Sequence, residues 1–589
     1  MVAPALAFAG GVAVGAAVAV NALRRRLARR RPRRVLVGLE VAASQSWRIL
    51  RGANGDDEKN ANDKNKKTRV AVFTNHTGVC PRTGRHVVDM LHACASVDLR
   101  LVFAPEHGFR GEKQAGYSSG GAATDSITGV AVFDAYRSRG DPAALASVLE
   151  EADVDCVVFD VQDVGARFYT YVSSMYDLLV AVARLNNDFS SPSETKTKDE
   201  TASRRLRKKS RRPRTRVVIL DRPNPLGGTT TEGPVVVEPG FDSFVSRVSV
   251  PIRHGMTVGE LALLFNKRFV ASDPCNPSGR KLAKTDLRVS PMRRWRRWMA
   301  WEDTKLPWVP PSPNVPSPTS ALAYVGTCLL EATNACEGRG TTTPFELIGA
   351  PWADNRLARE MNNVLGATNK EPSSSLRRGA LRRRRPTAPS VDARTRRPAS
   401  ACVWREAHFT PLWGKEKDVK CVGAAAMFSS SEDENLGENL ALSKIAFVKR
   451  ALFLEGVEVL LALKKLYPTA FQWREGPVAR QGVSRNGASK ESVSFSSRPD
   501  TRSLSRVERA AERARVLSPT KVTRNEKFSS SSSSSPPFID LLTGSPGLRL
   551  AMDGAPDPDS RRVAVERERE KWEKQLVAFE KSRRDALLY

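Results

Sequence analysis

Short apolar runs recur along the first half of this 589-residue chain, and segments with helical periodicity lie between most of them. The apolar runs are Arg69–Phe73, Leu99–Ala104, Val130–Phe133, Cys156–Phe159 and Val217–Leu220. The helical segments are His86–Cys94, Pro142–Ala152 and Tyr171–Leu185. Alternating strands and helices predict an α/β fold with a mostly parallel sheet and helices on both faces.

Polar residues follow four of these predicted strands directly. They are Thr74–Gly78, Pro105–Gly108, Asp160–Tyr171 and Asp221–Pro225. In open α/β sheets ligands bind beyond the carboxyl ends of the strands, so we expect a site where the four segments meet. The densest segment, Phe159–Tyr171 (FDVQDVGARFYTY), holds two carboxylates, a guanidinium and two phenols, which are costly to bury for structural reasons alone. A structural ion-pair network at the sheet edge is the alternative interpretation.

Three later segments carry similar chemistry. Pro251–Phe265 contains His254 and, at Thr257 and Glu260, the spacing of a capping box that opens a helix. Trp308–Pro318 (WVPPSPNVPSP) is held extended by its prolines. Glu337-Gly338-Arg339-Gly340-Thr341 places an acid and a base on a turn whose glycines permit close approach by a ligand. Rigid packing between domains is the alternative interpretation of the last two segments.

The chain lacks the usual sequence signals of nucleotide and metal sites. No GxGxxG follows a predicted strand, and no GxxxxGK[ST] occurs, so the backbone cradle for phosphates is missing. The eight cysteines show no CxxC spacing, and none of the six histidines forms an HxxxH pair. We therefore expect neither a cofactor nor a metal.

The formal net charge of +30 comes mainly from three basic runs, Arg24–Arg34, Arg204–Arg216 and Arg377–Arg397. These runs lie outside the apolar-patterned segments and lack interleaved aromatic residues. Such runs are typical of solvated insertions with nonspecific contacts to acidic surfaces. Specific binding of nucleic acid is not expected, and binding of RNA or membrane through the runs is the alternative.

The first residues have a different character. Met1–Leu23 contains no charged side chain and is long enough to cross a hydrocarbon layer of about 30 Å. Because the positive charges follow the apolar segment, the pattern favours a signal anchor over a cleaved secretory signal. We expect residues 1–23 to anchor the protein to a membrane, with an organelle-targeting leader as the alternative.

Composition divides the rest of the chain. Residues 24–67 are predicted to be a basic and polar linker, residues 68–268 the first domain and residues 286–589 the second. Three insertions within them are rich in Ser, Arg, Lys and Pro and are expected to be disordered, because they cannot bury enough apolar surface. They are residues 186–216, 368–397 and 476–537.

Six segments in order across Arg69–Trp352 closely resemble the NamZ-type exo-β-N-acetylmuramidases, a bacterial glycoside hydrolase family. They are FAPEHGFRG, FDVQDVGARFYTY, LDRPNPLGG, PIRHGMTVGELA, WVPPSPNVPSP and EGRGTTTPFELIGAPW. The resemblance implies a Rossmann-like N-terminal domain and a C-terminal α/β domain, with the active site in the cleft between them. It also implies release of terminal N-acetylmuramic acid from the non-reducing ends of peptidoglycan fragments.

In that family the glutamate of the EHG motif is the favoured catalytic acid, and this role falls on Glu106. Glycosidases need a second group as well, which is Asp160 or Asp163 acting on water, or the acetamido group of the substrate. Three arginines suit the planar lactyl carboxylate of a muramic-acid-containing saccharide, namely Arg167, Arg222 and Arg339. The predicted contacts to sugar hydroxyls are Asn75, Asn224, His254 and Asn314. The other predicted cleft residues are His107, Gln162, Tyr169, Asp221, Ser312 and Glu337.

The chain departs from the bacterial pattern in its first segment and its insertions, which leave the matched motifs intact. An active exo-acting glycoside hydrolase is the function predicted. A membrane-tethered saccharide-binding protein without turnover is the alternative, and the presence of all the acidic motif residues weighs against it.

Overall fold

The computed structural model describes residues 34–51, 67–111, 113–114, 123–188, 214–274, 276, 281–366, 402–428, 451–476 and 535–589. The predicted membrane segment 1–23 lies outside these residues, as do most of the linker 24–67 and of the three predicted insertions. In the described part of the chain, no helix combines the length and the apolar character that crossing a membrane requires.

A seven-stranded sheet forms the centre of the first domain. Its strands are β1 (Thr68–Thr74), β2 (Val97–Ala104), β3 (Ala123–Thr124), β4 (Ala131–Asp134), β5 (Cys156–Asp160), β6 (Arg216–Leu220) and β7 (Asp286–Ser290). They lie in the order β3-β4-β2-β1-β5-β6-β7, and every neighbouring pair is parallel except β3 with β4. The predicted α/β class and mostly parallel sheet are confirmed.

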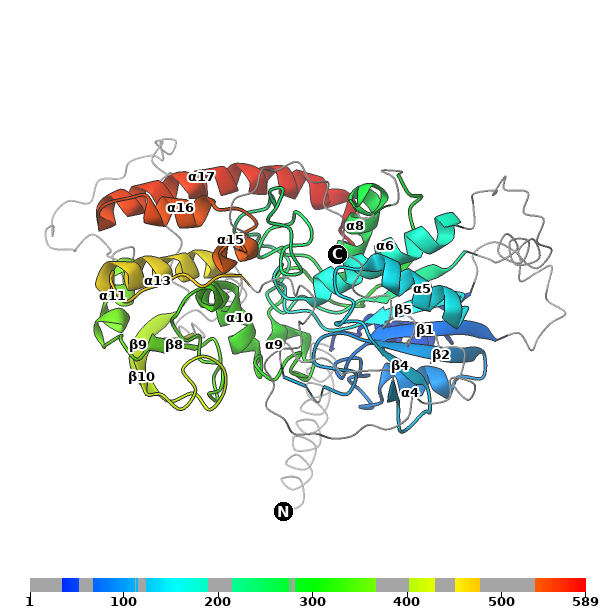
Figure 1. Cartoon of the computed structure of the whole chain (residues 1–589). Coiled ribbons are helices and arrows are strands. Elements are labelled where there is room, and N and C mark those ends of the chain that lie inside the picture. The colour runs from blue at the N-terminus through cyan, green and yellow to red at the C-terminus, as the bar shows by residue number, and fades with distance from the viewer. Residues whose placement is uncertain are drawn as a thin grey trace, which may run out of the picture.

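Helices cover both faces of this sheet, as alternation along the strands requires. Ala71 and Phe73 of β1 share one apolar core with α5 (Pro142–Ala152), α6 (Tyr171–Asp188) and α8 (Val258–Arg268). Val70 and Val72 face a second core with α2 (Gly38–Ser44) and α4 (Val87–His92). Figure 1 shows α5 and α6 above the strands and α4 below them. The predicted capping box is present, because Thr257 accepts from the Glu260 N–H while the Glu260 side chain accepts from the Thr257 N–H.

Two segments extend the sheet domain beyond the predicted bounds. Residues of the predicted linker form α2 and a 3₁₀ turn at Arg48–Leu50, and the Gly38 N–H donates to the Asp221 carbonyl at 2.8 Å. Gly38 lies so close to β6 that an added Cβ would stand 2.2 Å from the Asp221 nitrogen. β7, whose first residue is the predicted start of the second domain, pairs with β6.

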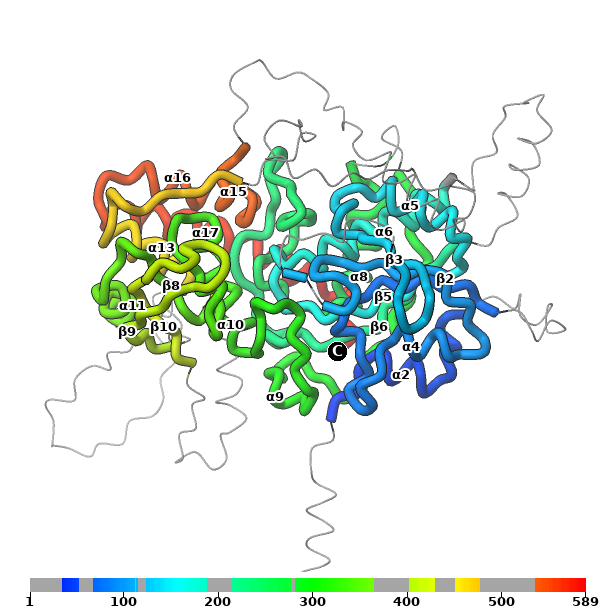
Figure 2. Tube along the Cα trace, turned by 60° about the horizontal axis from the view of Figure 1, so that its bottom comes forward, coloured from blue at the N-terminus to red at the C-terminus, as the bar shows by residue number. Residues whose placement is uncertain are grey.

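The second region lies beside the first in both views (Figures 1 and 2). Its antiparallel sheet has the order β8-β10-β9. The strands are β8 (Leu347–Ala350), β9 (Val403–Phe409) and β10 (Cys421–Met427). The helices are α10 (Pro318–Thr327), α11 (Arg356–Gly366), α13 (Leu452–Leu466), α15 (Phe538–Thr543), α16 (Gly547–Asp553) and α17 (Pro558–Arg583). The short helix α9 (Trp301–Thr304) instead packs through Trp301 into the second core of the sheet domain.

Helix α17 runs along both regions, from the end near α16 to the end near α8 (Figure 1). Trp572 packs edge-on against Phe453 of α13, with ring centroids 5.6 Å apart. At the other end Arg583 donates to the Gly255 carbonyl at 2.8 Å, and the Lys267 ammonium of α8 pairs with Asp585. The helix therefore fastens the second region to the sheet domain.

The order of the parallel strands marks the point of the sheet edge where a ligand is expected. The chain leaves β1 toward β2 on one side and later returns to β5 on the other side. Loops that follow such neighbouring strands diverge, and they leave a ligand-binding crevice beyond the carboxyl ends. The residues after β1, β2 and β5 are therefore the first place to look for a site.

Candidate active site

Glu106 lies in the loop after β2 and is only partly buried. The Thr170 hydroxyl donates to Glu106 Oε2 at 2.7 Å. Burial raises the pKa of the Tyr136 phenol, and the negative charge of Glu106 raises it further. Glu106 is thus a carboxylate with one fixed oxygen, held among hydroxyl groups and still in reach of solvent.

His107 follows Glu106 with a backbone φ of +75°, an uncommon conformation for a residue with a side chain. His107 Nδ1 lies 2.9 Å from the Lys113 carbonyl oxygen. Burial lowers the pKa of His107, although the Glu106 charge opposes this shift. The lowered pKa favours the neutral imidazole near pH 7. Strained residues of this kind cluster at functional sites.

Asn75, the first residue after β1, is fully buried and positions Tyr171. Asn75 Nδ2 donates to the Tyr171 hydroxyl at 2.8 Å, while Asn75 Oδ1 accepts from the Thr77 hydroxyl at 2.6 Å. The Tyr171 hydroxyl in turn donates to the Pro311 carbonyl at 2.6 Å. The loop after β1, the start of α6 and the Pro-rich segment therefore meet at one hydroxyl.

The Pro-rich segment 308–318 crosses the strand ends. His76 Nε2 lies 2.6 Å from the Pro310 carbonyl oxygen, and Asn314 Nδ2 donates to Gln114 Oε1 at 3.4 Å. Ser312 Oγ accepts from the Asn314 N–H at 3.1 Å, which fixes the turn. Ser312 and Asn314 are both buried, so their contacts fix the position of the loop.

Asp163 and His254 face each other from the loops after β5 and before α8. His254 Nε2 lies 3.5 Å from Asp163 Oδ2, and the Gly165 N–H donates to the same oxygen at 2.6 Å. Neither Asp163 Oδ1 nor His254 Nε2 has a hydrogen-bond partner among the described residues. This pair therefore retains hydrogen-bonding capacity while it is buried.

Asp160 and Arg222, by contrast, neutralise each other. Arg222 Nε and Nη2 donate to the two oxygens of Asp160 at 2.5 and 3.0 Å, and Arg222 Nη2 also lies 3.3 Å from the Val79 carbonyl oxygen. Both residues are buried. The geometry favours a structural ion pair over the predicted roles of base and of lactyl ligand.

Asp221 is equally enclosed. Its Oδ2 accepts from the hydroxyls of Tyr589 at 2.6 Å and Thr257 at 2.9 Å, and its Oδ1 accepts from the Gly259 N–H at 2.8 Å. Burial raises the pKa of Asp221 to about 7 despite these donors. Its neighbours hold β6, α8 and the last residue together, and this favours a structural role.

Arg167 is fully buried, and no carboxylate of the described residues pairs with it. It donates to the carbonyls of Pro234, Val235, Val250 and Leu542 at 2.8–3.2 Å. Burial lowers the pKa of Arg167 to about 9. These bonds tie α15 to the sheet domain, so the geometry favours a fastening role over the predicted contact with substrate.

Gln162, Asn224 and Tyr169 also make internal contacts. Gln162 Nε2 donates to the Pro223 carbonyl at 2.8 Å, and Asn224 Nδ2 donates to the Met256 carbonyl at 3.0 Å. The Tyr169 ring packs edge-on against Tyr171, with centroids 4.8 Å apart, and against Tyr324 of α10, with centroids 5.7 Å apart. These three residues position the loops and join the two regions.

Glu337 and Arg339 belong to a charged cluster on the second region. Glu337 Oε2 pairs with Lys415 Nζ at 2.6 Å, and Arg339 donates to Glu337 Oε1 at 3.1 Å and pairs with Glu331 at 2.7 Å. Burial would raise the pKa of Glu337, but the charges of Lys415 and Arg339 outweigh it and hold the pKa low. The Arg339 charge also acts on His107, so this turn faces the Glu106 loop.

The predicted residues therefore separate into two sets. The structure brings together Asn75, Glu106, His107, Asp163, His254, Ser312, Asn314 and Arg339 around the ends of β1, β2 and β5. It places Asp160, Arg167, Asp221 and Arg222 in internal networks. Sequence reasoning missed Tyr136, Thr170 and Lys415. Thr170 had a signal because it lies inside the polar segment Asp160–Tyr171, and Tyr136 had one because it follows β4 as Glu106 follows β2, whereas Lys415 had none.

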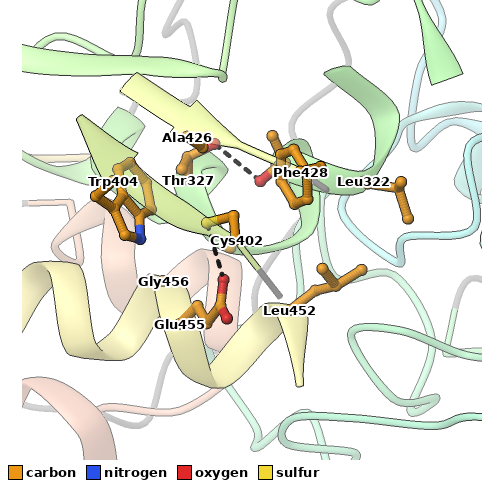
Figure 3. A pocket seen from close by; sticks show the side chains of 11 residues that line it. Leu322, Thr327, Cys402, Trp404, Ala426, Phe428, Leu452, Glu455 and Gly456 are labelled. Carbon is orange, nitrogen blue, oxygen red and sulfur yellow. Dashed lines mark hydrogen bonds between the residues drawn. The ribbon is translucent and has the colours of Figure 1, made fainter. Parts of the chain in front are cut away.

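Across the described ranges no three His, Cys, Asp or Glu side chains gather closely enough to hold a metal ion. An apolar hollow lies elsewhere, between α10, α13 and the small sheet, where Cys402 Sγ lies 3.5 Å from Glu455 Oε2 (Figure 3). Its residues do not include those around Glu106.

Comparison with known proteins identifies relatives. The family described as "Exo-beta-N-acetylmuramidase NamZ, N-terminal" matches residues 70–319, and its C-terminal counterpart matches residues 322–375. The chain is 33% identical over 408 residues to the peptidoglycan β-N-acetylmuramidase NamZ of Bacillus subtilis (strain 168), covering 69% of this chain and 76% of that protein. A solved DUF1343 family protein from Bacteroides fragilis aligns with a TM-score of 0.58 at 23% identity, over 95% of this chain and 100% of that chain.

Proposed function

The chain belongs to the exo-β-N-acetylmuramidase NamZ family of glycoside hydrolases, and we propose that it releases terminal N-acetylmuramic acid from the non-reducing ends of peptidoglycan fragments, with Glu106 as the catalytic acid. The family predicted from the motifs is confirmed by these comparisons. The substrate and the role of each residue are our proposal.

One observation supports this assignment more than any other. Glu106 is the carboxylate at the strand ends that is both partly exposed and fixed by a side-chain donor, with Thr170 at 2.7 Å. A general acid must be within hydrogen-bond reach of the leaving oxygen and must keep a defined orientation. Glu106 meets both requirements, whereas Asp160 and Asp221 are enclosed by other side chains.

The surrounding residues supply position and polarity. Glu106 would donate its proton to the oxygen between the two sugars as the bond to the anomeric carbon breaks. Neutral His107 and the Tyr136 phenol border the same carboxyl group. The Pro-rich loop, held by His76 and Tyr171, would form the wall opposite the strand ends.

Arg339 is the best candidate to bind the lactyl carboxylate that distinguishes muramic acid from glucosamine. Its side chain is 18% exposed although it pairs with Glu331 and Glu337, whereas Arg222 is only 5% exposed. Arg339 also faces the Glu106 loop from the second region. The remaining predicted arginine, Arg167, is enclosed by carbonyl groups.

The test is hydrolysis of a muramyl–glucosaminyl disaccharide by the full chain. We expect the wild type to release free N-acetylmuramic acid. Glu106→Gln should lower kcat by about 10²–10⁴-fold, because it removes the proton that the leaving oxygen needs. Glu458→Gln, a carboxamide substitution on α13 where Glu458 pairs with Arg562, should leave kcat unchanged.

Two outcomes would contradict the proposal. Full activity of Glu106→Gln would remove Glu106 from the mechanism. Saccharide binding by calorimetry without any product after prolonged incubation of the wild type would favour a binding protein instead.

A further inference from the structure

Asp163 and His254 are two predicted site residues that are buried and still leave polar side-chain atoms unsatisfied. Asp163 is 5% exposed and His254 is 0% exposed. Even so, Asp163 Oδ1 and His254 Nε2 have no hydrogen-bond partner among the described residues. Buried polar atoms are normally satisfied, so an unsatisfied carboxylate oxygen at a sheet edge calls for an explanation.

The hydrogen bonds around His254 determine which nitrogen carries its proton. The Met256 N–H donates to His254 Nδ1 at 3.2 Å, so Nδ1 is the acceptor of the neutral ring. The proton is then on Nε2, which lies 3.5 Å from Asp163 Oδ2. Arg583 of α17 donates to the His254 carbonyl at 3.3 Å and holds the backbone of this residue.

The two oxygens of Asp163 therefore have different surroundings. Oδ2 accepts from the Gly165 N–H at 2.6 Å and faces His254 Nε2. Oδ1 has no hydrogen-bond partner among the described residues. An ionised carboxylate accepts hydrogen bonds and donates none, so the group that would satisfy Oδ1 is a hydrogen-bond donor on a ligand.

The distance between the loops that carry Asp163 and Glu106 limits the catalytic role of Asp163. Asp163 follows β5, Glu106 follows β2, and β1 lies between these strands. Two strand spacings put the starts of the two loops roughly 10 Å apart. A carboxylate that attacks the anomeric carbon directly stands only about 5 Å from the acid. The spacing leaves room for a sugar substituent between the two groups.

Both carboxylates nevertheless act on the same hydroxyl. Burial raises the pKa of Tyr171, and the charges of Glu106 and of Asp163 each raise it further. The Tyr171 hydroxyl is fixed between Asn75 and Pro311. The Gln162 N–H, next to Asp163, donates to the Thr77 hydroxyl at 2.9 Å, and this hydroxyl donates to Asn75 Oδ1, so Asp163 is tied to the same loops as the proposed acid.

From this geometry we propose that Asp163 Oδ1 accepts a hydrogen bond from the acetamido N–H of the substrate, and that His254 is the positioning residue that holds Asp163. The proposal rests on the proposed function and names the second group that the reaction needs. The acetamido oxygen, and not a protein carboxylate, is then the nucleophile.

The proposed reaction has two steps. The acetamido oxygen forms a bond to the anomeric carbon while the bond to the leaving oxygen breaks and that oxygen takes the proton of Glu106. Positive charge develops on the acetamido nitrogen, and the Asp163 carboxylate stabilises it through the N–H. Water then attacks the anomeric carbon and gives a proton to the Glu106 carboxylate, and the acetamido group is regenerated with retained configuration.

The first arm of the test varies the substrate. Aryl β-muraminides with N-acetyl, N-fluoroacetyl and N-difluoroacetyl groups are hydrolysed by the full wild-type chain. We expect kcat/KM to fall with each fluorine, because fluorine weakens the acetamido oxygen as a nucleophile, and NMR to show the β-anomer as first product. Rates that do not depend on fluorine, or an α-anomer as first product, would overturn the proposal.

The second arm varies the protein. Asp163→Asn should lower kcat by about 10²–10³-fold with little change in KM, because it weakens a contact that strengthens in the transition state. His254→Phe should lower kcat by about 10–100-fold, and His254→Gln, which keeps a donor, should recover part of that loss. Equal losses in His254→Phe and His254→Gln would overturn the positioning role.

A matched control separates chemistry from folding. Asp177→Asn also changes a buried aspartate, which lies on α6 and pairs with Arg247. It should change the melting temperature and leave kcat per folded molecule unaffected. A wild type that releases no muramic acid defeats the proposed function, whereas an active wild type with a fully active Asp163→Asn variant defeats this inference alone.

Discussion

Two polar clusters at the carboxyl edge of one sheet differ in whether their carboxylate oxygens have hydrogen-bond partners. In the open cluster, Glu106 is partly exposed and Asp163 keeps one oxygen without a partner. In the sealed cluster, both oxygens of Asp160 are bound by Arg222, and Asp221 is enclosed by four donors. The clusters have similar residue types, and both include a residue at the end of β5.

The difference shows that residue type at a strand end does not distinguish a catalytic site from a structural hydrogen-bond network. A buried ion pair with both oxygens satisfied has no capacity left for a ligand, and breaking it leaves an uncompensated charge. A carboxylate with a free oxygen or access to solvent can still act on a substrate. Substitutions in the sealed cluster should therefore change stability, and substitutions in the open cluster should change catalysis.

The largest effect on stability should follow removal of the Arg222 guanidinium. Arg222→Met keeps the length of the side chain and leaves the Asp160 carboxylate buried and unpaired. Breaking a buried pair from one side costs about 3–5 kcal/mol, so the free energy of unfolding in urea should fall by that amount. The kcat of the fraction that stays folded should be close to the wild-type value.

Glu106→Gln is the matched substitution in the open cluster. It should leave the free energy of unfolding within about 0.5 kcal/mol of wild type, as substitutions at partly exposed positions usually do. An Arg222→Met protein that is stable but inactive would place the Asp160 pair in the active site and break the comparison.

The pH dependence of stability should show how tightly Asp221 is enclosed. Burial raises its folded-state pKa to about 7 from an ordinary value of 3.8. Between these pH values the folded chain binds more protons than the unfolded chain, so the free energy of unfolding falls as pH rises from about 4 to 7. One pKa unit corresponds to about 1.4 kcal/mol, which limits this contribution to about 4 kcal/mol.

Asp221→Asn isolates that contribution, because asparagine does not titrate. Urea unfolding of both proteins at several pH values between 4 and 8 gives the difference in slope. We expect the stability of wild type relative to Asp221→Asn to decrease across this range. A constant difference would mean that Asp221 titrates at its ordinary pKa and that the sealed cluster admits water.

Local patterns in the sequence predicted most of the elements. The switch from Phe159 to Asp160 marks the end of β5, and Pro142 marks the start of α5, because each depends on residues next to it in the chain. The predicted second domain begins at residue 286, whereas Asp286–Ser290 forms β7 and pairs with β6, a strand far away in sequence.

The candidate site was harder to predict for the same reason. Asp221 is sealed in part by Tyr589, Arg167 by Leu542, and Glu337 by Lys415. Each partner lies far along the chain and carries no signal that links it to the residue it binds. The sequence therefore indicated which polar residues meet at the sheet edge, and only the structure separates those that are satisfied from those that are free to act.

The smallest predicted effect tests how the open cluster is held. The Thr170 hydroxyl donates to Glu106 Oε2 at 2.7 Å, and Thr170→Val removes it while keeping the shape of the side chain. A hydrogen bond to a charged group contributes about 1.5–3 kcal/mol, so kcat/KM should fall by roughly 10–100-fold if the bond matters fully in the transition state. Thr170→Ser keeps the hydroxyl and should retain most of the activity, and neither variant should lower the melting temperature as Arg222→Met does. If Thr170→Val instead lowered the free energy of unfolding and kept its kcat/KM, the Thr170 hydroxyl would have a structural role like that of the sealed cluster. Its contact with Glu106 would then contribute to stability and not to catalysis.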